Sequence, residues 1–235
     1  DISGLAERAA LEAAENRQSK ELRSFDEYLP EVWRHIEAVI RGEITGLKTG
    51  FPDIDAHTGG FQKTDFVILG GRPGMFKTSM ALEMIVNVGL DGGVGAFFEL
   101  EMTAAQVVRR ALYQKGKVNS QSIKRGISPE RELPKIRAAQ DRISGKRIFF
   151  DDSTGLTPLQ AMSKCRKLKS KQGRLDLVVI DNVQIMNGDG NFKGDRRAEL
   201  ASVSNNLKRM AKDLDTVVIG ISHLNRESAK SSDPE

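Results

Sequence analysis

The hydrophobic residues of this chain gather in short runs, and longer amphipathic stretches separate the runs. Five mainly apolar runs lie at 65–70, 94–100, 147–150, 175–181 and 216–222. Runs of this kind are typical of strands that are buried on both faces of a sheet. Apolar residues at helical spacing predict helices at about 78–90, 103–114, 129–143, 158–172 and 196–214. Because strands and helices alternate, we expect an α/β fold with a mostly parallel, twisted sheet and helices on both faces.

The residues before this domain follow another pattern. We expect an N-terminal helical linker over 1–42 and the α/β domain over 43–235. An Ala- and Glu-rich helix is predicted at 4–19, a turn at 24–29, and Pro30 suits the first position of a second helix. Apolar residues then recur at helical spacing until Gly42, namely Val32, Trp33, Ile36, Val39 and Ile40. This stripe predicts packing either on the chain's own domain or on a neighbouring subunit, and its spacing favours neither. Irregular connections are expected at 115–128 and 186–196.

Composition narrows the class of protein. The chain has 235 residues, 39% of them hydrophobic, which is enough for one large domain with a full core. Its single cysteine, Cys165, excludes a disulfide within the chain, so we expect a reducing, intracellular setting. No apolar run is long enough to cross a membrane, and the polar start is unlike a signal peptide. Because the chain begins at Asp1 and ends in a polar stretch, we expect a piece of a longer protein.

The segment GGRPGMFKTS, residues 70–79, has the composition of a phosphate-binding loop. It follows an apolar run and precedes an amphipathic stretch, which is the setting that such a loop needs. Main-chain N–H groups and the start of a helix present partial positive charge to a phosphate. Lys77 is predicted to reach the terminal phosphates, and the Thr78 hydroxyl is predicted to ligate Mg²⁺. A chance glycine-rich turn followed by Lys and Thr is the alternative.

Phe76 departs from the usual pattern of this loop, which has glycine at the same position. Phosphate contacts come from main-chain N–H groups, so a side chain there does not by itself forbid the loop. If φ at Phe76 is negative, we expect the residue to fit with its ring pointing away from the nucleotide. If φ is positive, we expect the site to be strained.

Acidic and polar residues follow three of the predicted strands. Asp181 ends one run, Glu99 and Glu101 lie at the end of another, and His223 follows a third. Parallel strands present their carboxyl ends at one edge of the sheet, where ligands bind. Asp181 is therefore predicted to hold Mg²⁺ beside Thr78, and Glu101 to orient or deprotonate the attacking water. His223 is placed to sense the γ-phosphate, with a structural role as the alternative. For Glu99 we expect a surface or packing role.

Four ordered segments together resemble the ATPase domain of the DnaB-type replicative DNA helicase family, within the wider RecA-like fold. The resemblance extends over most of the chain, from about residue 25 to 228. ITGLKTGFPDIDAHTGGFQKTDFVILGGRPGMFKTS resembles the approach to the family's Walker A motif, and LVVIDNVQIM resembles its Walker B segment. FFELEM resembles its F-S-L-E-M segment, and VVIGISHLNR resembles its S-Q-L-N-R motif.

The resemblance implies an ATP- and Mg²⁺-dependent hydrolase and helicase with the P-loop NTPase core. Its catalytic residues would be Lys77, Glu101 and His223, and Thr78 and Asp181 would hold the metal. The nucleotide would lie on Gly71, Arg72, Pro73, Gly74, Met75, Phe76, Lys77, Thr78 and Ser79. Three positions depart from the family's pattern: Phe76 stands for glycine, His223 for glutamine and Asn182 for a commonly aromatic residue.

The resemblance also implies a ring, in particular a hexamer, that moves on single-stranded DNA and unwinds duplex. The stripe before Gly42 is similar to a linker helix that docks on the adjacent subunit. The loop at 187–200 is similar to one that faces the central channel, which makes Lys193, Arg196 and Arg197 candidate DNA contacts. The family's arginine finger and a further DNA-contacting segment are expected beyond Glu235. A primase, a helicase loader and the cytoplasm of a bacterial or phage-infected cell complete what the resemblance implies.

Charge supports DNA binding only weakly. The net charge is +4, from 36 basic and 32 acidic residues. In the loop at 187–200, three acidic residues offset the three bases, so a solvated loop is an equal alternative. The basic run at 164–174 is expected to be the wet outer face of a helix that turns Cys165 and Leu168 inward.

Two other functions stay open. A recombinase or clock-type ATPase shares the fold, although the F-x-L-E-M and S-x-L-N-R pairing argues against it. A non-hydrolysing assembly or loader module would fit if Phe76 had abolished nucleotide binding. Magnesium-dependent ATP binding that is lost in Lys77→Ala would favour the motor.

Overall fold

The computed structural model describes residues 22–127, 129–192 and 194–224. The chain divides into one unit up to Glu43 and a second unit from Ile44 onward. The helix predicted at 4–19 lies outside the described residues. Among the described helices, none is both long and apolar enough to cross a membrane.

The described part of the first unit is built around helix α2, Phe25–Ile40. Its start is set by a capping box in which the Ser24 N–H donates to Glu27 Oε1 at 2.9 Å. The sequence pattern predicts a turn at 24–29 and a helix that begins at Pro30, and this prediction is wrong. The cap starts the helix at Phe25, five residues before Pro30, so Pro30 lies inside it. No residue of α2 is buried, and Trp33 and Ile40 keep 58% and 78% of their surface exposed.

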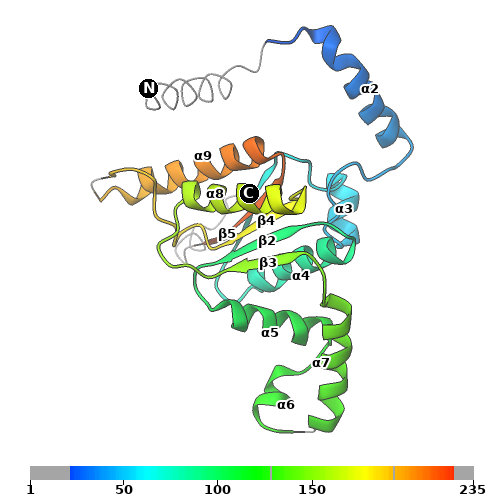
Figure 1. The fold of residues 1–235 in the computed structure, drawn as a ribbon, viewed down its shortest axis with the longest axis vertical. Coiled ribbons are helices and arrows are strands. Elements are labelled where there is room, and N and C mark those ends of the chain that lie inside the picture. Colours follow the sequence, from blue (N-terminus) through cyan, green and yellow to red (C-terminus); the bar gives the residue numbers. More distant parts are fainter. Residues whose placement is uncertain (1–21, 128, 193, 225–235) are drawn as a thin grey trace, which may run out of the picture. The chain divides into compact units, whose positions relative to one another are not determined.

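The second unit contains a sheet of five strands, all parallel, in the order β1-β5-β4-β2-β3 (Figure 1). The strands are β1 Phe66–Gly71, β2 Gly95–Glu99, β3 Ile148–Asp151, β4 Leu177–Asp181 and β5 Val217–His223. Every residue of β2 and β4 is buried, which explains why those runs lack polar alternation. The predicted fold class is confirmed.

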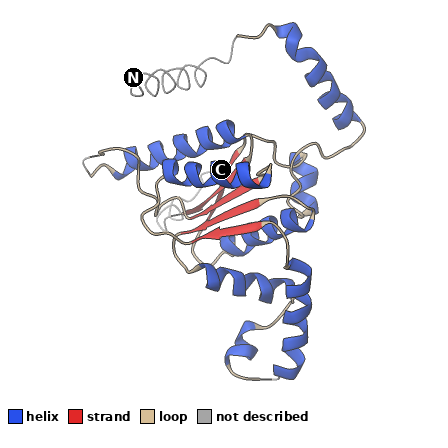
Figure 2. Ribbon diagram, viewed as in Figure 1, coloured by secondary structure: helices blue, strands red, loops and turns tan. Residues whose placement is uncertain are grey.

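Helices cover both faces of this sheet (Figures 1 and 2). On one face lie α4 Lys77–Leu90, α5 Ala104–Lys115 and α7 Pro129–Ile143; on the other lie α8 Pro158–Gln172 and α9 Arg196–Leu214. Neighbouring strand residues point to opposite faces, so Phe97 joins the core under α4 while Phe98 joins the core under α8 and α9. Burial on both sides gives β2 and β4 a fixed position, and with them the groups at their ends.

Two short helices were not predicted. Helix α3 spans Pro52–Thr58, and α6 spans Ser120–Lys124 inside a connection that was expected to be irregular. Both depend on local polar contacts rather than an apolar stripe: the Asn119 side chain accepts two N–H groups at the start of α6, and buried Asp55 of α3 accepts the Thr49 N–H and hydroxyl. Hydrophobic periodicity cannot detect such helices.

The basic run on α8 has the predicted orientation. Cys165 is fully buried, and Leu168 packs against the same core. Several of the basic groups are paired along the surface, including Lys164 with Asp151 at 2.5 Å and Arg174 with Asp176 at 2.6 Å. The run is therefore a solvated, ion-paired helix face.

Candidate nucleotide site

The carboxyl ends of the strands bring the predicted phosphate and metal residues to one rim. The Thr78 hydroxyl, in the first turn of α4, donates to Asp181 Oδ2 at the end of β4 over 2.6 Å. The neighbouring Lys77 is buried, and its Nζ donates to Gly71 O at 2.8 Å and to Arg72 O at 3.0 Å. Residues that are about a hundred positions apart in the chain thus meet in one place.

The start of α4 is left open toward this rim. Its N-cap residue is Phe76, whose side chain makes no cap hydrogen bond, and its first turn holds no acidic residue. Helices α5, α8 and α9, in contrast, each have a side chain that accepts their first N–H groups. An uncapped helix start offers N–H donors and partial positive charge to an anion.

Phe76 adopts the left-handed conformation, with φ +56° and ψ +21°. This is the positive φ for which we expected strain, because a Cβ in this region costs about 1–2 kcal/mol. Its side chain is 79% exposed, and Gly74 two residues earlier also has a positive φ, of +82°. The loop thus keeps the curled backbone that glycine normally supplies, although a phenylalanine stands at the turn.

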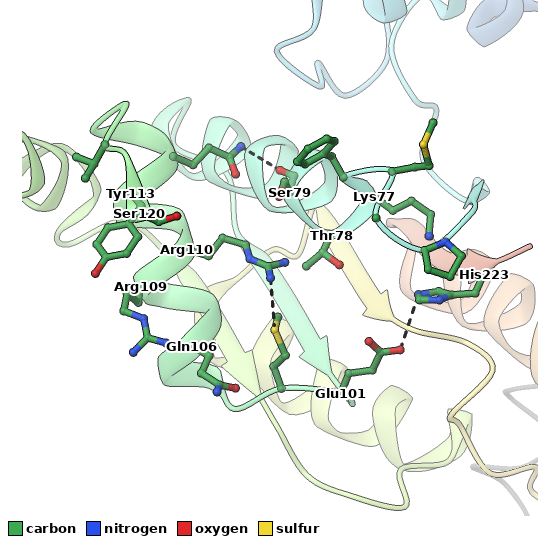
Figure 3. Close-up of a pocket in the computed structure, with 17 residues that line it drawn as sticks. Lys77, Thr78, Ser79, Glu101, Gln106, Arg109, Arg110, Tyr113, Ser120 and His223 are labelled. Atoms are coloured by element: carbon green, nitrogen blue, oxygen red, sulfur yellow. Dashed lines mark hydrogen bonds and ion pairs between the residues drawn. The ribbon is translucent and has the colours of Figure 1, made fainter. Parts of the chain in front are cut away.

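A cavity of about 790 Å³ opens beside the loop (Figure 3). Residues 73–79 of the predicted nucleotide set line it, together with Glu101 and His223; Gly71 and Arg72 contribute the carbonyls that hold Lys77. Helix α5 supplies a wall that the sequence analysis missed, formed by Gln106, Arg109, Arg110, Tyr113 and Gln114. The signal was present as a polar and aromatic face that repeats at helical spacing in the segment directly after Glu101.

Glu101 lies past the end of β2 with its side chain directed into this cavity (Figure 3). Its Oε1 accepts a hydrogen bond from Asn182 Nδ2 and lies 3.7 Å from His223 Nε2. Asn182 is one of the departures from the family pattern, and here it orients the predicted catalytic carboxylate. Glu101 is thus held from two neighbouring strand ends while its side chain stays 41% exposed.

Glu99 is buried, so of the two roles expected for it, surface or packing, the structure supports packing. Its Oε1 accepts the N–H groups of Glu101 and Met102, each at 3.1 Å, and so shapes the turn that carries Glu101. Burial, and then repulsion from Asp181, raise the pKa of Glu99 to about 7. Burial also raises the pKa of Asp181, and the Thr78 hydroxyl partly opposes that rise.

The residues at the rim fit Mg²⁺. Asp181 Oδ1 is buried without a hydrogen-bond partner among the described residues, directly beside the Thr78 hydroxyl on Oδ2. Within the described ranges, no group of three or more His, Cys, Asp or Glu could hold a metal by itself. Magnesium commonly takes one or two protein ligands and completes its shell with phosphate oxygens and water, which is the ligand set available here.

The three candidate DNA residues have different surroundings. Lys193 lies outside the described residues. Arg197 is exposed, and no side-chain contact holds it within the described part of the chain. Arg196 instead donates to Gln184 O and, at 3.3 Å, to Met186 O, and it pairs with Glu199. These contacts give Arg196 a structural task in holding the loop.

The parallel sheet, the uncapped helix start and the acids at the strand ends define the class of RecA-like P-loop proteins. Within this class, the sequence model of the DnaB-like helicase C terminal domain matches residues 46–235. The chain belongs to this family.

Individual relatives agree with the family match. The chain is 34% identical to "Replicative DNA helicase DnaC" of Bacillus subtilis (strain 168) over 96% of its own length and 50% of the relative. It is 33% identical to "Replicative DNA helicase DnaB" of Geobacillus stearothermophilus over 97% of its length and 51% of that protein. The chain therefore spans about half the length of these curated relatives.

Solved structures show the same fold. One solved "ATPase Domain" superposes with a TM-score of 0.84 at 31% identity, over 91% of this chain and 75% of that one. "The Structure Of A DnaB-Like Replicative Helicase And Its Interactions With Primase" gives a TM-score of 0.81 at 30% identity, over 97% of this chain and 55% of that one. The predicted family and the RecA-like core are confirmed.

Proposed function

We propose that this chain is the ATP-driven motor domain of a replicative DNA helicase. In this proposal it hydrolyses ATP at the subunit interfaces of a hexameric ring, moves on single-stranded DNA and unwinds duplex. The observation that carries the proposal is the 2.6 Å contact between Thr78 and Asp181 beside an uncapped helix start. This arrangement provides a hydroxyl, a carboxylate and free N–H donors where a Mg²⁺-bound triphosphate needs them.

The loop would bind the phosphates through its main-chain N–H groups. Lys77, which now donates to two carbonyls of its own loop, would turn its ammonium to the terminal phosphates. Thr78 and Asp181 would hold Mg²⁺, which when bound neutralises negative charge on the phosphate oxygens. The α5 wall with Arg109, Arg110 and Tyr113 would contact the rest of the nucleotide.

Hydrolysis would depend on Glu101 and His223. Glu101 faces the cavity and is oriented by Asn182, so it is placed to orient or deprotonate the attacking water. His223 lines the same cavity and would donate a hydrogen bond that is lost together with the γ-phosphate. In a ring, an arginine finger from a neighbouring subunit would speed hydrolysis at this site by on the order of 10³.

The ring and the DNA path would use other surfaces. The exposed stripe of α2, with Val32, Trp33 and Ile36, would dock on the adjacent subunit. Lys193 and Arg197 would contact single-stranded DNA from the loop after β4, while Arg196 would keep that loop in place. One similar structure is described with primase, and a primase and a helicase loader are the further partners we propose, in the cytoplasm of a bacterial or phage-infected cell.

A nucleotide-free assembly or loader module is the second candidate, and the left-handed φ of Phe76 favours it. Strain at the phosphate loop lowers the stability of the binding conformation and with it the affinity for nucleotide. The recombinase or clock-type ATPase, the other alternative, has no comparable observation in its favour.

A magnesium-dependent ATP titration tests the motor proposal. We expect saturable binding by the wild type in Mg²⁺, loss of binding in Lys77→Ala, and unchanged binding in Lys208→Ala. Lys208 is a suitable control because its Nζ donates to Thr64 O, just before the start of β1. This contact lies at the amino ends of the strands, whereas the candidate site lies at their carboxyl ends. Absence of binding by the wild type at millimolar ATP would favour the assembly module.

A further inference from the structure

Gln184 joins the ends of two strands at the rim of the site. Its Nε2 donates to Ser222 Oγ at 2.7 Å and to His223 O at 3.0 Å. Its Oε1 accepts the His223 N–H at 3.1 Å. One amide thus holds both backbone groups of the predicted γ-phosphate sensor.

This arrangement is more specific than packing. The amide of Gln184 uses both its donor and its acceptor on the backbone of His223. If that backbone shifts, the Gln184 side chain must shift with it or lose both hydrogen bonds. A partly buried amide is costly to leave unpaired, so the contact favours joint movement over separation.

The main chain of Gln184 contacts the residues that hold the loop after β4. Its main-chain carbonyl oxygen accepts a hydrogen bond from the Arg196 guanidinium, which also donates to Met186 O at 3.3 Å and pairs with Glu199. Glu199 Oε1 in turn accepts the Gly188 N–H at 2.8 Å. A continuous set of polar contacts therefore runs from β5 to the base of the loop that starts at Asn187.

The base of this loop is also tightly packed. A Cβ at Gly188 would clash with Phe192 Cε2 and would lie only 2.8 Å from Glu199 Cγ. Such close packing leaves little freedom for a small displacement to be absorbed locally. A shift of Arg196 would consequently move the loop base around Gly188.

The opposite end of the network lies in the nucleotide cavity. His223 Nε2 is 3.7 Å from Glu101 Oε1, and both side chains line the cavity (Figure 3). Just beyond His223, the Leu224 N–H donates to Gly71 O at the start of the phosphate loop. A ligand that repositions His223 therefore acts on the residue that Gln184 holds.

We propose that Gln184 is the positioning residue that couples the nucleotide cavity to the loop at 187–195. This inference rests on the proposed function, in which the cavity takes ATP and the loop takes DNA. Through Gln184, occupation of the γ-phosphate position sets the placement of the loop base by way of His223 and Arg196. Gln184 itself touches neither ligand.

Hydrogen–deuterium exchange of the whole chain, with and without Mg²⁺ and a non-hydrolysable ATP analogue, tests this coupling. In the wild type we expect the analogue to slow exchange both in peptides of the phosphate loop and in peptides that cover 185–200. In Gln184→Leu, which keeps the size of the side chain but not its hydrogen bonds, we expect phosphate-loop protection to remain and the response of 185–200 to be lost.

Two further variants separate coupling from general damage. Gln184→Glu keeps an acceptor for the His223 N–H but loses the Nε2 donor, and we expect it to retain part of the loop response. Gln62→Leu removes another partly buried amide, one that donates to Thr45 Oγ1 and Gly60 O before β1, and we expect a wild-type response. If Gln62→Leu lost the loop response as Gln184→Leu does, the effect would be nonspecific and the coupling proposal would be overturned.

The same experiment distinguishes failure of this inference from failure of the proposed function. If phosphate-loop peptides respond to the analogue and the loop responds equally in wild type and Gln184→Leu, coupling through Gln184 is refuted while nucleotide binding stands. If phosphate-loop peptides respond but the wild-type loop does not, the coupling is likewise refuted. If no peptide of the wild type responds at any analogue concentration, the proposed function fails and the coupling fails with it.

Discussion

At the scale of single residues, Phe76 shows that a main-chain site can keep its shape without its usual side chain. The residue is the N-cap of α4, has a φ of +56° and points its ring into solvent. The ring therefore stabilises little, and the backbone conformation has to be maintained by the strand before it and the helix after it.

Phe76→Gly should consequently stabilise the protein. Relief of about 1–2 kcal/mol of left-handed strain, less about 0.5–1 kcal/mol of glycine entropy, raises the free energy of unfolding by up to about 1.5 kcal/mol. Urea denaturation monitored by circular dichroism measures this change. Met75→Gly is the matched control, since exposed Met75 does not have a positive φ and we expect its replacement to destabilise. Equal effects of the two variants would contradict a strained Phe76.

Glu99 is the second residue whose environment predicts a measurable property. Its pKa in the folded protein is raised from 4.5 to about 7 by burial and by Asp181. Between these pH values the folded chain keeps a proton that the unfolded chain has released, so the contribution to stability is full below the unfolded pKa and is lost as pH rises through 7.

In a buffer with EDTA and no nucleotide, we expect the wild type to lose stability relative to Glu99→Gln between pH 5 and pH 8. The expected difference is about 2 kcal/mol, because one pKa unit corresponds to about 1.4 kcal/mol and the surroundings of Glu99 are in part polar. Thermal melts at several pH values provide the measurement. Glu130→Gln, at an exposed position of α7, should follow the wild-type curve. Parallel curves for wild type and Glu99→Gln would disprove a buried, protonated Glu99.

At the scale of elements, α2 carries an apolar stripe that the described residues of its unit do not bury. Such a contiguous exposed patch is typical of an interaction surface. Its helix does not need a partner in order to start, because the capping box of Ser24 and Glu27 begins it locally. The element is thus complete in itself, and its apolar face is available.

Replacing Trp33 by Glu should therefore reduce self-association without unfolding the ATPase unit. Trp33 is 58% exposed and belongs to the central part of the stripe, where a charge is costly once a partner covers it. Light scattering coupled to size exclusion gives the mass. Glu37→Gln, an exposed change on the same helix, should leave the mass as in the wild type. An unchanged mass in Trp33→Glu would contradict a role of α2 in the proposed subunit interface.

In the loop after β4, the net charge in the sequence is a poor guide to which basic residues are free to bind a ligand. Its acids offset its bases in sequence, yet each acid has a structural task. Asp195 accepts the first N–H groups of α9, Asp189 accepts the Leu159 N–H, and Glu199 holds Gly188 and Arg196. Arg197, in the first turn of α9, is left exposed, which makes it the described residue that best suits the DNA contact we propose.

At the scale of the whole molecule, ligand binding should be visible as global stability. A ligand that binds only the folded chain stabilises it by about 2.7 kcal/mol at a hundred times its Kd. We expect Mg²⁺ with ATP to raise the melting temperature, and excess EDTA to remove most of the rise because Thr78 and Asp181 would then lose the Mg²⁺ that we propose they hold. Lys77→Ala should not respond to either addition. A rise that is insensitive to EDTA would argue against a metal at this pair.

The sequence alone determined those features that repeat locally. Buried strands β2 and β4 lie where unbroken apolar runs predicted them, and the helices between strands follow apolar residues at helical spacing. Because parallel strands must end at one rim, the meeting of Thr78 and Asp181 also followed from the sequence. The roles of Lys77, Glu101, Asp181 and His223 stay predictions until the variants are measured.

Tertiary structure decided most of the rest, since burial and long-range hydrogen bonds do not depend on neighbours in the chain. The start of α2 is the exception: Pro30 lies inside the helix because the local capping box that begins at Ser24 starts it, and that signal was present in the sequence. Glu99 and Glu101 are two residues apart, yet one is buried beside Asp181 and the other faces the cavity, because the strand ends between them. Arg196 and Arg197 are adjacent, and only contacts with Gln184, Met186 and Glu199 give the first a structural task and leave the second to solvent.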